Sequence, residues 1–132
     1  MLGSVTAEGI TIIADLEAGI GTLTRLSAAA VDVTVVVVEP TPRSIDVASR
    51  AIAVAQDQHH GRIVVVANKI VDDDDRIRIR QAFGELPFVE VPADAHIDEA
   101  DRLGVSPVDH DPDSVAVHAL ENLASDLVSL FP

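Results

Sequence analysis

The chain has no cysteine, tryptophan or tyrosine, and only three phenylalanines among its 132 residues. Without cysteine it can form neither a disulfide nor a thiolate metal site, which suits a cytoplasmic protein. Hydrophobic residues nevertheless make up 48% of the chain. With so few aromatic rings, the core has to be built from Val, Ile, Leu and Ala packed in layers, which indicates the α/β class.

Positive charge is also scarce. Nine basic residues stand against twenty-two acidic ones, a formal net charge of -13. This charge repels phosphate backbones, so a broad nucleic-acid interface is excluded. It also means that a nucleotide would need locally concentrated positive groups. No apolar run reaches the roughly 20 residues that span a bilayer, so we expect neither a membrane segment nor a membrane partner.

The apolar segments predict a single domain, residues 1–132, with a mostly parallel sheet of about four strands between layers of helices. The four Val residues at 35–38 show no polar alternation, which is typical of a strand covered on both faces. The expected strands are Ile10–Asp15, Val31–Glu39, Arg62–Asn68 and Pro87–Val91.

The intervening segments carry helix signals. Thr41 can cap a helix that has Pro42 as its first residue and ends near residues 59–61. The run Asp72–Asp75 supplies acids to the start of another helix. Arg76–Arg80 alternates with period two, as a strand does, but the crossover needs a helix there. We expect a short helix ending at Gly104, irregular chain at 107–112, and a final helix with Val115, Ala119, Leu123, Leu127 and Leu130 inside.

Polar residues follow the expected strands. A carboxylate at a strand end, such as Asp15, can hold the water shell of Mg²⁺, and a loop glycine such as Gly19 can offer its N–H to a terminal phosphate. The plainer interpretation of Asp15 is a cap for the next helix. Asn68 offers a donor and an acceptor in one plane, which suits a nucleotide base. An Asn-Lys pair after a strand is nevertheless common.

The five histidines show no pair spaced for metal binding on one helix face. We interpret them as surface or capping residues. The run of acids at 72–75 lacks the spaced ligands of a calcium loop, so a solvated helix start is expected there.

Four segments together resemble the second half of the deviant P-loop ATPases of the MinD/ParA group, within the SIMIBI class. The closest resemblance is to CooC-type accessory ATPases, which help to load nickel into carbon monoxide dehydrogenase. The segments are Asp15-Leu16-Glu17-Ala18-Gly19, Glu39-Pro40-Thr41-x-Arg43-Ser44-Ile45, Asn68-Lys69 and Val91-Pro92-Ala93-Asp94.

The resemblance implies roles for several residues. Asp15 would hold Mg²⁺ through water, and Gly19 would begin the switch that senses the terminal phosphate, with Glu17 beside them. Asn68 and Lys69 would meet the adenine base. Pro92 and Asp94 would form the second wall of the base pocket.

The pattern of a phosphate loop, glycines followed by Gly-Lys-Thr/Ser, does not occur in the 132 residues. The paired cysteines of CooC-type proteins are absent as well. We therefore expect a truncated P-loop fold that is inactive as an ATPase alone and takes ATP and Mg²⁺ only when a partner supplies the phosphate loop. The expected function is a subunit or fragment in nucleotide-dependent metallocentre assembly, with a metalloenzyme as client. The alternative is an inactive protein-interaction module of the same fold.

In the family, the phosphate-loop strand lies between the strands that correspond to Ile10–Asp15 and Val33–Glu39. Its loss would leave open sheet edges, which favour association. We therefore expect either direct pairing of these two strands, or a second polypeptide or homo-oligomer that joins through the exposed edges.

Overall fold

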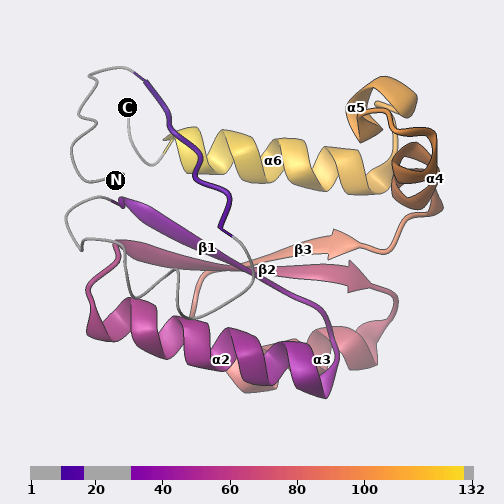
Figure 1. Ribbon diagram of the computed structural model, residues 1–132. Coiled ribbons are helices and arrows are strands. Elements are labelled where there is room, and N and C mark those ends of the chain that lie inside the picture. Colours follow the sequence, from indigo (N-terminus) through magenta and orange to yellow (C-terminus); the bar gives the residue numbers. More distant parts are fainter. Residues whose placement is uncertain (1–9, 17–30, 130–132) are drawn as a thin grey trace.

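The computed structural model describes residues 10–16 and 31–129, and within them the chain folds into a parallel α/β layer structure (Figure 1). The sheet has the order β1 (Val33–Val38), β2 (Arg62–Ile70) and β3 (Phe88–Pro92). Both strand pairs are parallel. The α/β class with helices flanking a parallel sheet is therefore confirmed.

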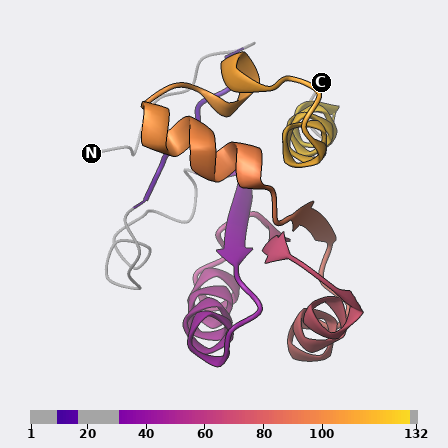
Figure 2. The ribbon, with the colours of Figure 1, turned by 90° about the vertical axis from the view of Figure 1, so that its right-hand side faces the viewer.

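Helices cover the two faces of the sheet. Helix α2 (Pro42–Asp57) packs on β1 and α3 (Asp73–Phe83) packs on β2, on one face. Helix α6 (Val115–Ser129) packs on β3 from the opposite face, while α4 (Ala95–Leu103) and the short α5 (Pro107–His110) lie near the carboxyl ends of the strands (Figure 2).

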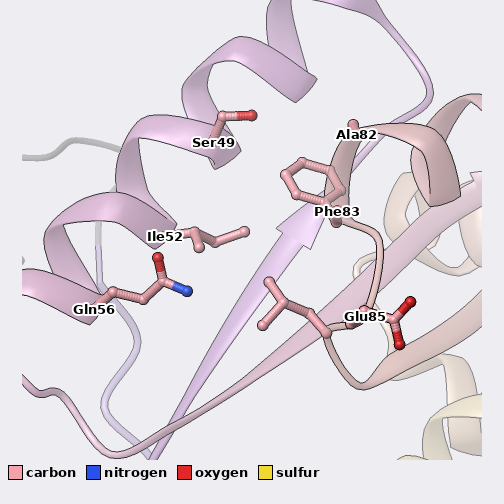
Figure 3. Close-up of a pocket in the computed structure, with 7 residues that line it drawn as sticks. Ser49, Ile52, Gln56, Ala82, Phe83 and Glu85 are labelled. Carbon is pink, nitrogen blue, oxygen red and sulfur yellow. The ribbon is translucent and has the colours of Figure 1, made fainter.

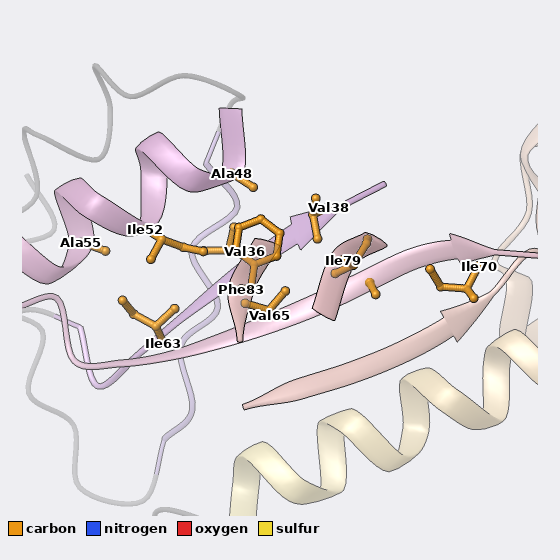
Figure 4. Close-up of a cluster of buried hydrophobic side chains, with 11 residues drawn as sticks. Val36, Val38, Ala48, Ile52, Ala55, Ile63, Val65, Ile70, Ile79 and Phe83 are labelled. Carbon is orange, nitrogen blue, oxygen red and sulfur yellow. The ribbon is translucent and has the colours of Figure 1, made fainter. Parts of the chain in front are cut away.

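The larger hydrophobic core lies between the sheet and the α2–α3 layer (Figure 4). Val38, Val65 and Ile79 are fully buried there. A smaller cluster on the other face joins Val66 of β2 to Ala116 of α6. Strand β2 is thus covered on both faces, as expected for the central strand of a parallel sheet.

The start and end of α2 follow the predicted pattern. The Thr41 hydroxyl accepts a hydrogen bond from Ser44 N at 3.2 Å, and Pro42 is the first helical residue. After α2 ends at Asp57, His59 and Gly61 adopt positive φ angles of 57° and 61°. This turn delivers the chain directly to β2.

Helix α3 resolves the period-two pattern of Arg76–Arg80. Asp72 caps the helix by accepting a hydrogen bond from Asp75 N at 2.9 Å. Ile79 is completely buried, whereas Ile77 is 52% exposed. The predicted helix is therefore confirmed: Ile79 and Phe83, four residues apart, lie on one helix face and are both buried in the core.

The predicted strand Ile10–Asp15 is wrong. These residues form no strand, and Ile12 and Ile13 are 51% and 90% exposed. Figures 1 and 2 place the segment on the same side of the sheet as α6, near β1. An isolated apolar run becomes a strand only when it gains a hydrogen-bonded neighbour, and in the described part of the chain β1 pairs with β2 alone.

Three smaller predictions also need correction. Residues 107–110 form α5 rather than irregular chain. Helix α6 begins at Val115, which is 62% exposed rather than inside, and its buried residues are Ala116 and Val117, whereas the predicted inner residues Ala119 and Leu123 do pack against the smaller core cluster. His60 is fully buried rather than a surface residue, and its ring Nε2 lies 3.0 Å from the side-chain oxygen of Gln58. Leu130, which was also predicted to lie inside, is outside the described residues.

Candidate functional site at the carboxyl edge of the sheet

The candidate site lies where the three parallel strands end. Because the strands run in one direction, the residues after β1, those at the end of β2 and those after β3 meet at one edge, beside α4 (Figure 2). Carboxyl edges of this kind are where α/β proteins bind ligands. Of the predicted site residues, Asn68, Lys69, Pro92 and Asp94 lie along this edge.

An ion pair connects the ends of β1 and β2. Lys69 Nζ lies 2.8 Å from Glu39 Oε1, with both side chains partly exposed. The hydrogen bond and charge of Glu39 raise the pKa of Lys69, and the negative charge of Asp98 on α4 adds to this. Lys69 is the only lysine in the sequence. The residue type that usually neutralises nucleotide phosphates is therefore already paired with a carboxylate.

The backbone of β2 is irregular at this point. Lys69 has a φ of 58°, and the register of β2 against β3 shifts between Ala67 and Ile70. A left-handed conformation costs a residue with a side chain about 1 kcal/mol, and such bulges re-aim side chains at strand ends. Asn68 is partly exposed there, and no hydrogen bond to its side-chain amide occurs within the described residues. Its donor and acceptor are available to a ligand.

The loop after β1 is held by four hydrogen bonds, one of them donated by Thr41 N to the Glu39 carbonyl at 2.8 Å. Ser44 Oγ accepts from Glu39 N at 2.9 Å, and Thr41 Oγ1 accepts from Ser44 N. Arg78 of α3 donates to the Pro40 carbonyl at 3.0 Å. These bonds fix the position of Glu39, and hence of the ion pair with Lys69.

Asp94 organises the region after β3. Its Oδ1 accepts a hydrogen bond from His96 N at 3.0 Å, and its Oδ2 accepts from Ser114 Oγ at 2.8 Å and Ala116 N at 3.2 Å. The bond from His96 N, followed by those from Ser114 and Ala116, holds the pKa of Asp94 below its usual range. This carboxylate ties the start of α4 to the start of α6. Asp94 is also the N-cap of α4, and neither this cap nor its bond to buried Ser114, twenty residues away, was predicted from the sequence.

The predicted magnesium residue Asp15 is not a strand-end group in the described structure. Asp15 is described and exposed, but its segment is not a strand. Glu17 and Gly19 lie outside the described residues. Their proposed roles stay predictions.

Two arginines of α3 near the edge are also paired with carboxylates. Arg76 bonds Glu90 at 2.6 Å through Nε and contacts Asp73 through Nη1, and these partners raise its pKa. Arg78 lies 3.1 Å from Asp75. At this edge Lys69, Arg76 and Arg78 are thus paired with carboxylates, whereas the Asn68 side-chain amide has no hydrogen bond within the described residues.

Two of the hollows on the described surface lie near the sheet and its helices. One of about 300 Å³ lies beside the edge on the α3 side, lined by Ile70, Val71, Arg76, Glu90 and Pro92. The other, of about 360 Å³, lies between α2 and α3 (Figure 3) and is lined by Ser49, Ile52, Gln56, Ala82, Phe83, Glu85 and Leu86. Only the first shares a residue, Pro92, with the predicted base site.

Metal ligands do not gather in the described part of the chain. No group of three or more His, Asp or Glu side chains there could hold a metal ion. His96 Nδ1 instead lies 2.9 Å from Asp111 Oδ2, and His110 Nε2 lies 3.4 Å from Glu99 Oε2. Across residues 10–16 and 31–129, no helix is long and apolar enough to cross a membrane.

The described residues thus form a parallel α/β protein with polar side chains at the carboxyl edge of its sheet. Comparison with known proteins adds a relationship. The chain is 29% identical over 120 residues to an uncharacterized ATP-binding protein of Methanocaldococcus jannaschii. The aligned region covers 89% of this chain and 46% of that protein. It is 32% identical over 102 residues to the carbon monoxide dehydrogenase accessory protein CooC of Rhodospirillum rubrum, covering 76% of this chain and 39% of that protein.

The chain is thus related to ATP-binding proteins that include a CooC protein, and it spans less than half the length of these curated relatives. No model of a known protein family matches it.

Proposed function

We propose that residues 1–132 form the base-binding and switch part of a CooC-like ATPase, and act in nucleotide-dependent metallocentre assembly for a metalloenzyme client. The observation that carries the proposal is the similarity to CooC over 102 residues. The fold supports the proposal in two ways. The carboxyl ends of its parallel strands meet at one edge, and the Asn68 side-chain amide at that edge has no hydrogen bond within the described residues.

In this proposal, Asn68 pairs with the adenine edge. Lys69, Pro92 and Asp94 shape the wall around the base, with Asp94 acting through the helix starts that its carboxylate holds. Asp15 contributes to the water shell of Mg²⁺, beside Glu17, and Gly19 provides the switch N–H.

The phosphate loop comes from outside these 132 residues. The edge supplies no unpaired lysine, since the single Lys69 is bound to Glu39. With a net charge of -13, a triphosphate would be repelled unless further N–H groups and cations were brought to it. Bound Mg²⁺ would supply charge neutralisation to the phosphates.

The base site is tested by titrating adenosine into ¹⁵N-labelled protein and following side-chain amide signals by NMR. The sequence has only two asparagines, Asn68 and Asn122, and Asn122 lies exposed on α6. We expect the Asn68 signals to shift saturably while those of Asn122 stay in place. Asn68→Ala should abolish the response of neighbouring backbone amides, and the control Asn122→Ala should leave it unchanged. A response that survives Asn68→Ala contradicts the assignment.

The second candidate is a protein-interaction module that binds no nucleotide. The pairing of Lys69, Arg76 and Arg78 with carboxylates favours it. It predicts that adenosine produces no saturable shift at all. The two candidates are therefore separated by the same titration.

A further inference from the structure

Strand β2 carries one extra residue near its carboxyl end. Between the pair of Ala67 with Glu90 and the pair of Ile70 with Pro92, β2 has two residues where β3 has only one. Ala67 and Ile70 are nevertheless both buried in the larger core, although side chains three positions apart on a regular strand point to opposite faces. This bulge therefore leaves two consecutive polar residues, 68 and 69, outside that core at the carboxyl edge.

Lys69 has the strained backbone conformation at this bulge. Its φ of 58° lies in the left-handed region, where glycine fits without steric conflict but a residue with a side chain does not. Such a conformation persists only where the surrounding structure holds it in place. The side chain of Lys69 makes a contact that glycine could not make, the ion pair of its Nζ with Glu39 Oε1 at 2.8 Å. This ion pair is thus available to hold the bulge from the side of β1.

Glu39 is itself held at the end of the neighbouring strand. The register of β1 and β2 places Glu39, the first residue after β1, level with Asn68. Glu39 N donates to Ser44 Oγ at 2.9 Å, and the Glu39 carbonyl accepts from Thr41 N at 2.8 Å. An isolated surface ion pair stabilises little, because both long side chains lose freedom when they meet. Here the backbone of one partner is already fixed, so less freedom is lost.

We infer that Glu39 is a positioning residue for the base site: by holding the Lys69 ammonium across the ends of β1 and β2, it keeps Asn68 turned towards the carboxyl edge. Rotation about φ of Lys69 turns the peptide group that joins it to Asn68, so the two residues are oriented together. The inference rests on the proposed adenine site at Asn68, and it adds a residue that acts on the base through Lys69.

The first test uses the free chain of residues 1–132 without nucleotide. Lys69 is the only lysine in the sequence, so an NMR spectrum of side-chain ammonium groups contains one lysine signal. We expect Glu39→Gln to shift this signal and to raise the exchange of its protons with water by about fivefold or more. The N–H residual dipolar couplings of Asn68 and Lys69 should change, while those of the regular part of β2, residues 62–66, should stay as they are.

A matched control and a rescue complete this test. Glu121 is an exposed glutamate on α6 whose Oε2 lies 3.6 Å from His118 Nδ1, so Glu121→Gln changes the net charge equally and should alter none of these signals. The charge swap, Glu39→Lys together with Lys69→Glu, keeps the combined length of the two side chains. The swap should restore the couplings of residues 68 and 69, whereas Glu39→Lys alone should disturb them as Glu39→Gln does.

Adenosine titration then connects the ion pair to the base. Glu39→Gln should weaken adenosine binding by about threefold or more, because the Asn68 amide is no longer pre-organised. The urea midpoint of unfolding should stay unchanged, since an exposed ion pair contributes little to stability. Glu121→Gln should bind adenosine as the unmodified chain does.

The measurements on the free chain decide the inference. It is overturned if Glu39→Gln leaves the couplings of Asn68 unchanged, because the bulge alone would then set the direction of this residue. It is also overturned if the charge swap fails to restore the couplings, or if Glu39→Gln disturbs them and adenosine binds as tightly as before. If the unmodified chain binds no adenosine, the proposed function fails instead, and the couplings still show whether Glu39 orients Asn68.

Discussion

Gly61 joins the turn after α2 to the first residue of β2, and its replacement by alanine should be unusually costly. Its φ of 61° lies in the left-handed region. A Cβ at this position would lie 2.6 Å from the Val31 carbonyl oxygen and closer still to the backbone of Asp32. Both obstacles are backbone atoms of the segment that enters β1, so they cannot rotate away as a side chain would.

Two contributions set the expected loss in the free energy of unfolding. The left-handed conformation costs an alanine about 1 kcal/mol relative to glycine. Overpacking against fixed atoms costs about 1–3 kcal/mol more, because β1 and β2 have to separate or shift register at this end. Gly61→Ala should therefore lower the free energy of unfolding by about 2–4 kcal/mol.

Gly104 provides a matched control. It has a left-handed backbone, with a φ of 67° and a ψ of 32°, but no atom lies within 4 Å of a Cβ added there. Alanine there should cost only the conformational term, about 1 kcal/mol. Urea denaturation followed by far-UV circular dichroism measures both variants. If Gly61→Ala is no less stable than Gly104→Ala, the close approach of β1 and the turn is refuted.

The other predictions concern helix packing and helix ends. Ile79→Ala should lower the free energy of unfolding by about 3 kcal/mol, because Ile79 is fully buried. Ile77→Ala, on the exposed face of the same helix, should lower it by less than about 0.5 kcal/mol. Equal losses in urea denaturation would contradict the helical assignment. Thr41→Ala should cost about 1 kcal/mol in the same assay by removing the cap of α2, and an unchanged midpoint would count against that cap. Asp94→Asn should lower the melting temperature by roughly 3–6 °C at pH 6. The pKa of Asp94 is lowered on folding, so the difference in melting temperature between the two proteins should be present above about pH 4 and should vanish as the pH falls through the folded pKa. A difference in melting temperature that does not change with pH would contradict this role of the carboxylate.

Local signals in the sequence were sufficient for most of the fold. The cap at Thr41, the acids before α3 and the unbroken Val run of β1 each depend on neighbours in the chain, and the structure confirms them. The segment Ile10–Asp15 failed because its apolar character fits a strand only if a partner strand lies beside it. That condition is not local, so composition could not supply it.

The candidate site divides in the same way. The sequence identified Asn68 and Lys69 as strand-end residues, and they lie at the carboxyl edge. The ion pair of Lys69 with Glu39 was not predicted, because the two residues are thirty positions apart and meet only through strand pairing. The hydrogen bond of Asp94 to Ser114 was missed for the same reason.

The central claim is that this chain holds the base side of a nucleotide site without the phosphate side. Calorimetric or NMR titrations that compare adenosine with Mg-ATP test it directly. The account predicts that residues 1–132 alone bind Mg-ATP no more than about threefold more tightly than adenosine, a gain of less than about 0.7 kcal/mol. Micromolar binding of Mg-ATP, about a hundredfold tighter than adenosine, would contradict it.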